Sequence, residues 1–242
     1  MKPLNPYRFK PEGREARALE FKTAEGVFCP TDTTTLLIKA CLQKILSPVK
    51  MLDLGCGVGA AGLTLAALGL CDGPLYASDI SADAVRLTRQ NAGELNVDVI
   101  AREGSMYEPW AGERFDVIVD DISGVSDDIA AISPWFPRGV ECNAGRDGTR
   151  WVAAVLAEAP RYLKKGGRAF FPVLSLSDEK KILAVAENRF ERVEMIAEKE
   201  WFLPSEMMAH LSVIKPLVDD GTIACEYKFG AWIWKTKIFC AS

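Results

Sequence analysis

From Pro48 onward, apolar and polar positions follow two alternating patterns. Five short runs of apolar and β-branched residues are each bounded by Gly, Asp or Pro, and this is typical of β-strands. They recur about every 20 to 25 residues, with one longer gap before the last. The runs are Val49–Leu52, Pro74–Ser78, Val97–Ala101, Phe115–Val119 and Arg168–Val173.

The segments between these runs have the period of amphipathic helices. Ser81 is expected to cap one helix, and Ser177 to begin another. A third helix is expected to end at Gly166-Gly167. Its apolar positions, spaced at i, i+3, i+4, i+7 and i+11, are Val152, Val155, Leu156, Ala159 and Leu163.

Alternation of strands and helices predicts an α/β fold with a mostly parallel sheet covered on both faces. The last 50 residues break the rhythm, because two expected strands, Val193–Glu198 and Ala231–Cys240, flank one expected helix from Ser205 to Leu217. An antiparallel closing strand fits this order. The chain is therefore expected to form a Rossmann-like, doubly wound, mostly parallel seven-stranded sheet with an antiparallel closing strand.

Composition narrows the classes of protein. The apolar fraction of 49% suffices for a sizeable core, and no apolar run approaches the roughly 18 residues of a membrane span. The first ten residues lack the apolar region of a secretory signal, so we expect a cytoplasmic protein with no membrane partner. The 7 cysteines contain no Cys-x-x-Cys pair and are expected to be reduced thiols.

The chemistry available to the side chains is limited. His210 is the only histidine, so we expect no metal site and no Ser-His-Asp triad. The net charge of -4 gives no overall basic footprint of a dedicated nucleic-acid binder. Catalysis by this chain is thus expected to rely on a bound cofactor.

The sharpest motif follows the first of the five runs. Asp53 ends an apolar strand, and Gly55, Gly57 and Gly59 alternate before a helix that begins at Ala60. Glycines allow positive φ and let a ligand lie against bare backbone, while the helix N-terminus offers free N–H groups. Alone, the three glycines could also make only a tight turn.

A second acid follows at the distance expected of a nucleoside site. Asp79 ends the next strand, twenty residues after Gly59, where a carboxylate can accept both hydroxyls of a ribose. The alternative for Asp79 alone is a helix cap. Together, the glycine loop and Asp79 favour a nucleoside cofactor.

Two cofactors fit a strand, a glycine loop and a helix. Gly57-x-Gly59-x-x-Gly62 matches the pyrophosphate fingerprint of an NAD-dependent oxidoreductase. However, Asp53 and Gly55 precede that match, and an acid followed by Gly-x-Gly-x-Gly is how an S-adenosylmethionine pocket begins. The spacing favours S-adenosylmethionine.

With these residues the chain resembles a class I S-adenosylmethionine-dependent methyltransferase over roughly residues 46–242. Within that superfamily it is most similar to the small-methyltransferase group, which includes release-factor glutamine methyltransferases and RNA guanine enzymes. Three further segments carry the narrower resemblance: Val27–Thr34 with Leu36-Leu37, Gly104–Pro109, and Gly145–Gly148 together with the run from Ala159 to Gly167.

The resemblance implies a division of the chain and a set of cofactor contacts. Residues 1–45 would form an N-terminal extension with a cofactor-covering helix, and residues 46–242 the methyltransferase domain. The implied cofactor-binding residues are Thr34, Asp53, Gly55, Cys56, Gly57, Gly59, Asp79, Ile80, Ser105, Met106 and Asp121.

The acceptor loop departs from the group's pattern. There the fourth strand ends in Asn-Pro-Pro-Tyr, whose oxygens accept hydrogen bonds from the nitrogen to be methylated. Here Asp121 stands at the Asn position, Ile122 and Ser123 replace the prolines, and Gly124 replaces the aromatic residue. Ser105 also stands where the group has an adenine-contacting acid. Asp121 and Ser123 are the candidate catalytic residues.

These departures leave the acceptor open among a protein side chain, an RNA base and a small molecule. Trp135-Phe136 and Trp201-Phe202 could rebuild an acceptor wall, although ordinary core packing is the more common role of such pairs. The sequence therefore predicts a methyltransferase that acts on a protein or RNA nitrogen. The alternative of another class is a non-catalytic S-adenosylmethionine-binding module.

Overall fold

The computed structural model describes residues 1–11, 17–122, 124–136, 140 and 142–242. Its strands are β1 (Tyr7–Phe9), β2 (Leu19–Phe21), β3 (Met51–Leu54), β4 (Leu75–Asp79), β5 (Val99–Glu103), β6 (Phe115–Asp120), β7 (Leu163–Leu174), β8 (Val193–Phe202), β9 (Glu226–Lys228) and β10 (Ala231–Ala241). Its helices are α1 (Asp32–Lys44), α2 (Ala60–Ala67), α3 (Ala82–Leu95), α4 (Asp127–Ile132), α5 (Arg150–Tyr162), α6 (Glu179–Arg189), α7 (Ser205–Met208) and α8 (Leu211–Asp219), with a 3₁₀ turn at Glu108–Trp110.

The main sheet has the strand order β5-β4-β3-β6-β7-β10-β8, and the short β9 adds to β10. The strands from β5 to β7 pair in parallel. β10 pairs antiparallel with both β7 and β8, so it is inserted next to the edge and does not form it. The predicted seven-stranded, mostly parallel sheet with an antiparallel strand near its end is confirmed.

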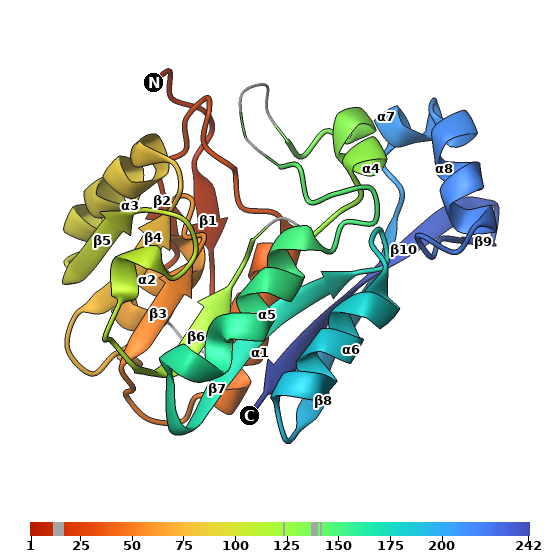
Figure 1. The fold of residues 1–242 in the computed structure, drawn as a ribbon. Helices are drawn as coiled ribbons and strands as arrows, with labels where there is room; N and C mark the ends of the chain where they lie inside the picture. Colours follow the sequence, from red (N-terminus) through yellow and green to blue (C-terminus); the bar gives the residue numbers. More distant parts are fainter. Residues whose placement is uncertain (12–16, 123, 137–139, 141) are drawn as a thin grey trace.

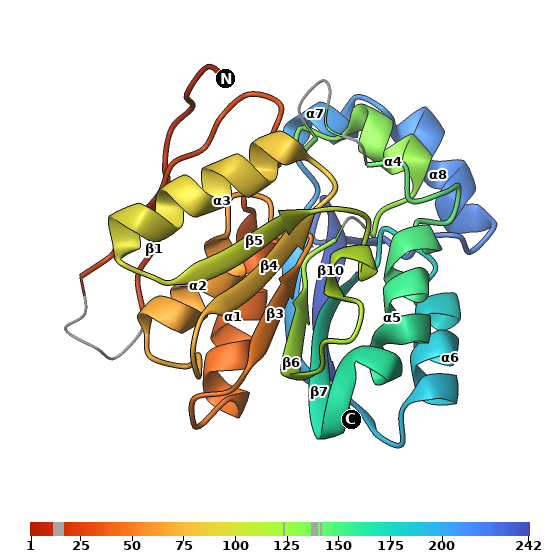
Figure 2. The same cartoon turned by 60° about the vertical axis from the view of Figure 1, so that its left-hand side comes forward.

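Helices cover both faces of this sheet (Figure 1, Figure 2). One face buries apolar side chains of α1, α2 and α3, including Leu37 and Leu63, against strand residues such as Met51. The other face buries α5 and α6, with Leu156 and Ile182 in the core. Because both faces are covered, β3 is buried along its whole length and reads as a continuous apolar run apart from Asp53.

A third apolar cluster lies apart from the two faces of the sheet. It joins α4, α7 and α8, which sit together beyond the ends of the central strands in both views (Figure 1, Figure 2). We call these three helices, Trp135 and Phe136 after α4, β9 and the adjoining ends of β8 and β10 the cap. Its buried core includes Ile129, Met207, Ile214 and Trp234.

Two sequence predictions about element ends are wrong. The helix expected over 205–217 is interrupted at Ala209 and His210, where the φ and ψ of His210 (-116° and 32°) leave the helical range. Met207 and Ile214, on either side of the break, are both buried in the cap. The pattern of apolar residues in the sequence therefore does not reveal the turn between them.

The second wrong prediction concerns Gly166-Gly167, which do not end a helix. α5 ends at Tyr162, and the glycines lie inside β7, where the register with β6 shifts between Phe115 and Val117. Gly166 has a φ of +75°, which suits the extra residues of a β-bulge.

The N-terminal segment carries a hairpin that the sequence did not reveal. β1 and β2 pair antiparallel, and Phe9 and Phe21 are buried in the same cluster as Leu37 of α1. The division between residues 45 and 46 stays a prediction. No helix in the described part of the chain has the length and apolar character needed to cross a membrane.

Candidate functional site

The candidate site lies where the order of the strands reverses. The chain runs outward from β3 through β4 to β5 and then returns to β6 on the other side of β3. The loops after β3 and β6 therefore diverge at the carboxyl edge of the sheet, and such a crevice is where ligands bind in open α/β sheets. Asp53, the glycine loop and Asp121 all lie at this edge.

The glycine loop depends on left-handed backbone and on close approach. Gly55, Gly57 and Gly59 have φ of +69°, +54° and +82°, and such angles disfavour residues with a Cβ. A Cβ on Gly55 would lie 2.4 Å from Cγ1 of Ile122, so the loop after β3 touches the loop after β6. Gly59 is the residue before α2, whose first turn faces the pocket through Ala60.

Asp79 joins the glycine loop to the start of α3. Its Oδ2 accepts a hydrogen bond from the N–H of Gly57 at 2.9 Å, and its Oδ1 accepts one from Ser81 N–H at 2.9 Å. Burial raises the pKa of Asp79, and the hydrogen bonds from backbone N–H groups lower it in part. Asp79 thus holds the local turn and also lines the pocket, so both roles considered from the sequence have a basis in the geometry.

Asp53 is a buried carboxylate, and only one of its two oxygens accepts a hydrogen bond within the described residues. Oδ2 accepts a hydrogen bond from the N–H of Gly62 at 3.0 Å, whereas Oδ1 is buried and has no hydrogen-bond partner within the described residues. Burial, together with the negative charges of Asp121 and Asp79, raises the pKa of Asp53 to about 7, although the hydrogen bond from Gly62 N–H opposes this shift. A cationic group bound in the pocket would relieve this cost.

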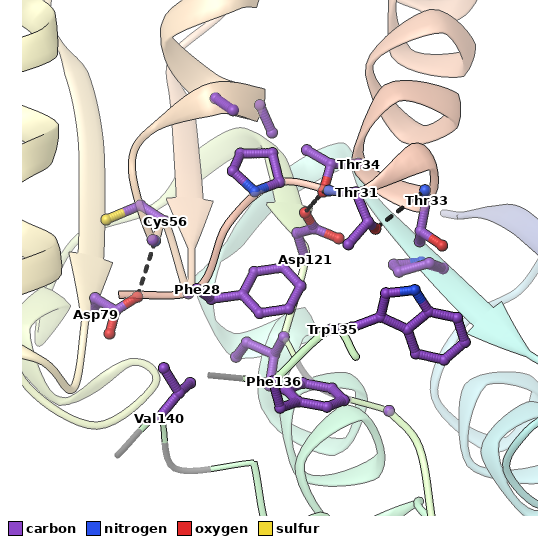
Figure 3. A pocket seen from close by; sticks show the side chains of 18 of the residues that line it. Phe28, Thr31, Thr33, Thr34, Cys56, Asp79, Asp121, Trp135, Phe136 and Val140 are labelled. Atoms are coloured by element: carbon purple, nitrogen blue, oxygen red, sulfur yellow. Dashed lines mark hydrogen bonds between the residues drawn. The ribbon is translucent and has the colours of Figure 1, made fainter. Parts of the chain in front are cut away.

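Asp121 lies at the end of β6 on the opposite side of the crevice. Its Oδ2 accepts a hydrogen bond from Oγ1 of Thr34 in α1 at 2.7 Å (Figure 3). Burial raises the pKa of Asp121 to about 6, even though the hydrogen bond from the Thr34 hydroxyl opposes this shift. This contact brings the predicted covering helix onto the predicted acceptor loop.

The neighbouring Asp120 is buried and does not line the pocket. Its Oδ1 accepts a hydrogen bond from the N–H of Ile122 at 3.0 Å, and this contact shapes the loop after β6. Burial, together with the negative charges of Asp121 and Asp53, raises the pKa of Asp120 to about 7, although the hydrogen bond from Ile122 N–H opposes this shift.

One pocket of about 540 Å³ brings most of the predicted residues together. Gly59 does not line it, and Ser123 lies outside the described residues. The predicted residues that line the pocket are Thr34, Asp53, Gly55, Cys56, Gly57, Asp79, Ile80, Ser105, Met106 and Asp121.

The glycine loop, Asp53 and Asp79 line one half of the pocket, which we call the cofactor half. The other half, which we call the acceptor half, has aromatic walls. The ring centroids of Phe28 and Phe136 are 5.6 Å apart, and those of Trp135 and Trp234 are 5.1 Å apart. The labelled rings of Phe28, Trp135 and Phe136 gather near Asp121 in Figure 3. The aromatic residues of the lining are Phe28, Trp135, Phe136, Trp151, Trp201, Phe202 and Trp234.

A chain of buried hydroxyls fixes one of these walls. Nε1 of Trp201 donates a hydrogen bond to Oγ1 of Thr236 at 3.0 Å, and that hydroxyl is 3.1 Å from Oγ1 of Thr33. Thr33 and Thr236 are both buried. The contacts tie α1, β8 and β10 together beside the pocket.

The aromatic walls were only half anticipated. Core packing was the favoured role of Trp135-Phe136 and Trp201-Phe202. The rings of Trp135, Phe136 and Trp201 do pack against the cap core, whereas Phe202 is exposed, and all four residues line the pocket. Trp151 and Trp234 were missed as lining residues, because a tryptophan in a helix or strand carries no signal of the side it faces. The Trp201–Thr236–Thr33 contacts span distant parts of the sequence and were also missed.

The residues present fit S-adenosylmethionine. Its cationic amine and sulfonium match Asp53 and the other acids of the lining, its carboxylate matches the N–H groups before α2, and its ribose matches Asp79. The orphaned Oδ1 of Asp53 is the observation in the structure that favours a cation there.

Sequence comparisons identify the class of protein. Residues 18–121 match the family described as the methyltransferase small domain. The release factor glutamine methyltransferase of Clostridium acetobutylicum is 28% identical over 197 residues, 76% of this chain and 67% of that protein. The release factor glutamine methyltransferase of Yersinia pestis is 33% identical, over 64% of this chain and 57% of that protein. The chain thus spans only about half to two thirds of these relatives.

Solved structures share the fold at low sequence identity. The 16S rRNA N2 methyltransferase of T. thermophilus, in complex with AdoMet and guanosine, has a TM-score of 0.61 at 17% identity, over 98% of this chain and 50% of that one. The ribosomal protein L11 methylase of Lactobacillus delbrueckii subsp. bulgaricus has a TM-score of 0.53 at 16% identity, over 87% and 80%. These structures share the predicted fold, and the family match and the named relatives support the predicted class of enzyme and its cofactor.

Proposed function

We propose that this chain, which belongs to the S-adenosylmethionine-dependent methyltransferases, transfers the cofactor's methyl group to a nitrogen atom of a protein or RNA acceptor. The relatives named above act on release factors or on 16S rRNA, so both acceptor classes enter the proposal by likeness alone. The cytoplasmic location expected from the sequence belongs to the same proposal.

A single observation carries the proposal. The glycine loop, Asp53 and Asp79 line the same pocket as Asp121 and the aromatic walls. A cofactor held by the first group would have its reactive end in a space with room for a second molecule, and Asp121 lies on the wall of that space. A module that only bound the cofactor would have no need of such a second compartment.

The chain's own residues have three tasks in this reaction. When bound, the cofactor supplies an electrophilic methyl carbon on a sulfonium that is itself the leaving group. Asp53, Asp79 and the glycine loop hold the cofactor, so that an approaching nitrogen is aligned in advance. The aromatic walls exclude water, and Asp121 accepts a hydrogen bond from the nitrogen as positive charge develops on it.

Replacement of Asp121 tests the proposal. Asp121→Ala is expected to lower turnover by about 10²- to 10³-fold, the scale for removing one preorganised polar group from a reacting centre. Asp121→Asn is expected to be milder, because it keeps an oxygen in place. Turnover is measured as S-adenosylhomocysteine produced with cell-extract fractions as the source of acceptor, and cofactor affinity is measured by calorimetry on the same variants.

The two measurements separate the alternatives. Cofactor affinity should change little in Asp121→Ala, because the side chain faces the aromatic half of the pocket. Loss of cofactor binding with no separate effect on turnover would move Asp121 to the cofactor contacts. If the wild-type chain binds S-adenosylmethionine but yields no S-adenosylhomocysteine with any fraction, the chain is a non-catalytic S-adenosylmethionine-binding module.

Calorimetry with NAD tests the remaining alternative. We expect S-adenosylmethionine to bind in the micromolar range, on the order of -8 kcal/mol, and NAD not to bind. The reason is that Asp53 and the orphaned Oδ1 favour a cationic group, whereas a pyrophosphate is anionic. Heat with NAD and none with S-adenosylmethionine would reverse this conclusion.

A further inference from the structure

We infer that the acceptor group is an alkyl ammonium, as on a lysine side chain or a free amine, bound between the aromatic walls and the Asp121 carboxylate. The inference rests on the proposed function and narrows it, because amides, nucleobases and amines were all open there. Three properties of the acceptor half of the pocket carry it: its charge, its rings and the position of Asp121.

The charge of the pocket is one-sided. Among its described lining residues there is no Lys, Arg or His, whereas four are acids: Asp32, Asp53, Asp79 and Asp121. Asp53 and Asp79 belong to the cofactor half and are engaged by the bound cofactor, so the surplus negative charge available to an acceptor is that of Asp121 and Asp32. The surplus favours a second cation and opposes an acceptor that brings phosphate groups close to the reacting atom.

The rings suit the same ligand. A cation over an aromatic face is attracted by the ring quadrupole, and desolvated sites of several rings are how proteins recognise ammonium groups. Phe28 and Phe136 approach within 5.6 Å, and Trp135 packs on Trp234 at 5.1 Å, so neighbouring walls present rings. The aliphatic stem of an alkyl amine would lie against the same apolar surface.

Asp121 supplies the charge that holds the nitrogen. It lies at the carboxyl end of β6, and its Oδ2 is fixed by the hydroxyl of Thr34 at 2.7 Å. An asparagine in this position would donate as well as accept, and so would suit an amide. A carboxylate only accepts, and this matches an ammonium, which only donates.

The chemistry balances without a further reactant. The ammonium gives one proton to the Asp121 carboxylate, which keeps it during methyl transfer and releases it to water when the product leaves. The freed lone pair of the nitrogen then bonds to the methyl carbon as the carbon–sulfur bond breaks and its electron pair stays on sulfur. The positive charge moves from the sulfonium to the methylated nitrogen, and a thioether remains.

The test measures binding of small probes to the full chain, with S-adenosylhomocysteine present to fill the cofactor half. Butylammonium represents the inferred group, butyramide the amide, and butyl phosphate the anion. Ligand-observed saturation-transfer NMR gives each dissociation constant. We expect butylammonium to bind at least tenfold more tightly than butyramide, and butyl phosphate not to bind.

Variants assign the binding to the proposed walls. Asp121→Asn, which keeps the shape of the side chain, should weaken butylammonium at least tenfold and bring butyramide to comparable or higher affinity. Trp135→Leu and Phe28→Leu should each weaken it threefold or more. Trp232→Leu is the matched control: Trp232 packs beside Tyr227 on the same cap without lining the pocket, so affinity should stay within twofold.

The outcomes are distinct from those of the proposed function. Tighter binding of butyramide or butyl phosphate by the wild-type chain overturns the inference, as does an Asp121→Asn variant that keeps its butylammonium affinity. Tritium transfer from S-adenosylmethionine to butylamine, a lysine peptide, a glutamine peptide or an RNA oligonucleotide then identifies the source of the amine. Transfer only to the glutamine peptide or the RNA also overturns it. Selective ammonium binding without any transfer instead contradicts the proposed function alone.

Discussion

Asp79 shows how one side chain serves both structure and binding. Its two oxygens accept N–H groups from Gly57 and Ser81, and the carboxylate still faces the pocket. We expect Asp79→Ala to weaken S-adenosylmethionine binding by about 1.5–3 kcal/mol, the scale of hydrogen bonds to charged groups. Calorimetry measures the change.

The matched control for Asp79 lies four residues along the chain. Asp83 lies in the first turn of α3, but it is half-exposed, pairs with Arg86 and does not line the pocket. Asp83→Ala should leave cofactor affinity unchanged. If Asp79→Ala does the same, its role is confined to the start of the helix.

At the scale of single residues, more of the pocket lining was named from the sequence in the cofactor half than in the acceptor half, and the roles of these residues stay predictions. Asp53 and Asp79 were found because each ends a strand at a fixed distance from a glycine loop, and that spacing is local. Trp151 and Trp234 were missed because the side they face depends on how the cap packs. Ser123, a candidate catalytic residue, stays a prediction, because it lies outside the described residues.

The glycine loop after β3 has a left-handed backbone at each of its three glycines, which disfavours other residues there. Gly57 has a φ of +54°, and an added Cβ would meet only the carbonyl oxygen of Phe28, at 3.7 Å, so the space beside it is open to a ligand. Gly57→Val should abolish cofactor binding, because β-branching opposes this φ and the side chain would fill that space.

A glycine elsewhere separates backbone strain from loss of the site. Gly73 has a φ of +81° with nothing within 4 Å of an added Cβ, and it does not line the pocket. Gly73→Val should therefore cost stability and leave binding intact. Circular dichroism establishes that both variants are folded, and unimpaired binding by a folded Gly57→Val would contradict the assignment of the loop.

Two buried threonines give opposite expectations for the same substitution. Thr236 accepts from Trp201 and contacts Thr33, so Thr236→Val would leave buried polar groups unsatisfied and cost about 1–3 kcal/mol. The hydroxyl of Thr64 in α2 is buried without a hydrogen-bond partner in the described structure, so Thr64→Val should be neutral or stabilising. Urea denaturation compares the two, and equal losses would contradict the role of the hydroxyl chain.

At the scale of elements, what the sequence could predict follows the range of the interactions. The parallel strands and their helices repeat a local pattern, so their order was correct. The break between α7 and α8 and the bulge at Gly166 depend on the partner that each segment packs or pairs with, and periodicity does not carry that information. β1 and β2 are only three residues each, too short for a period to be recognised.

The acids around the pocket give the whole molecule a pH dependence. Burial raises the pKa of Asp53 to about 7 and that of Asp121 to about 6, from ordinary values near 4. The folded chain therefore keeps protons that the unfolded chain has released, and its free energy of unfolding should fall as the pH rises from about 4 to about 7. Each group contributes up to about 1.4 kcal/mol per pH unit in this window.

A bound cation favours the ionised acids. It therefore restores the free energy of unfolding that the folded chain loses as the pH rises. The increase in melting temperature caused by S-adenosylmethionine should thus be larger at pH 7.5 than at pH 5.5. Asp53→Asn should flatten both dependences. Asp116, whose pKa is lowered mainly by Lys164 against the opposing effect of burial, titrates below this window and serves as the control position. A cofactor effect that is independent of pH would contradict the charge assignment.

The three separate apolar clusters have a consequence for how such a protein can diversify. The cofactor loops follow the central strands β3 and β4, whereas Trp135, Trp201 and Trp234, the last two at the ends of β8 and β10, belong to the third cluster, which has its own buried core. Substitutions within that third cluster can reshape the acceptor wall while the sheet and the cofactor contacts keep their packing. A lineage could therefore exchange one methyl acceptor for another by rewriting the cap and inheriting the rest unchanged.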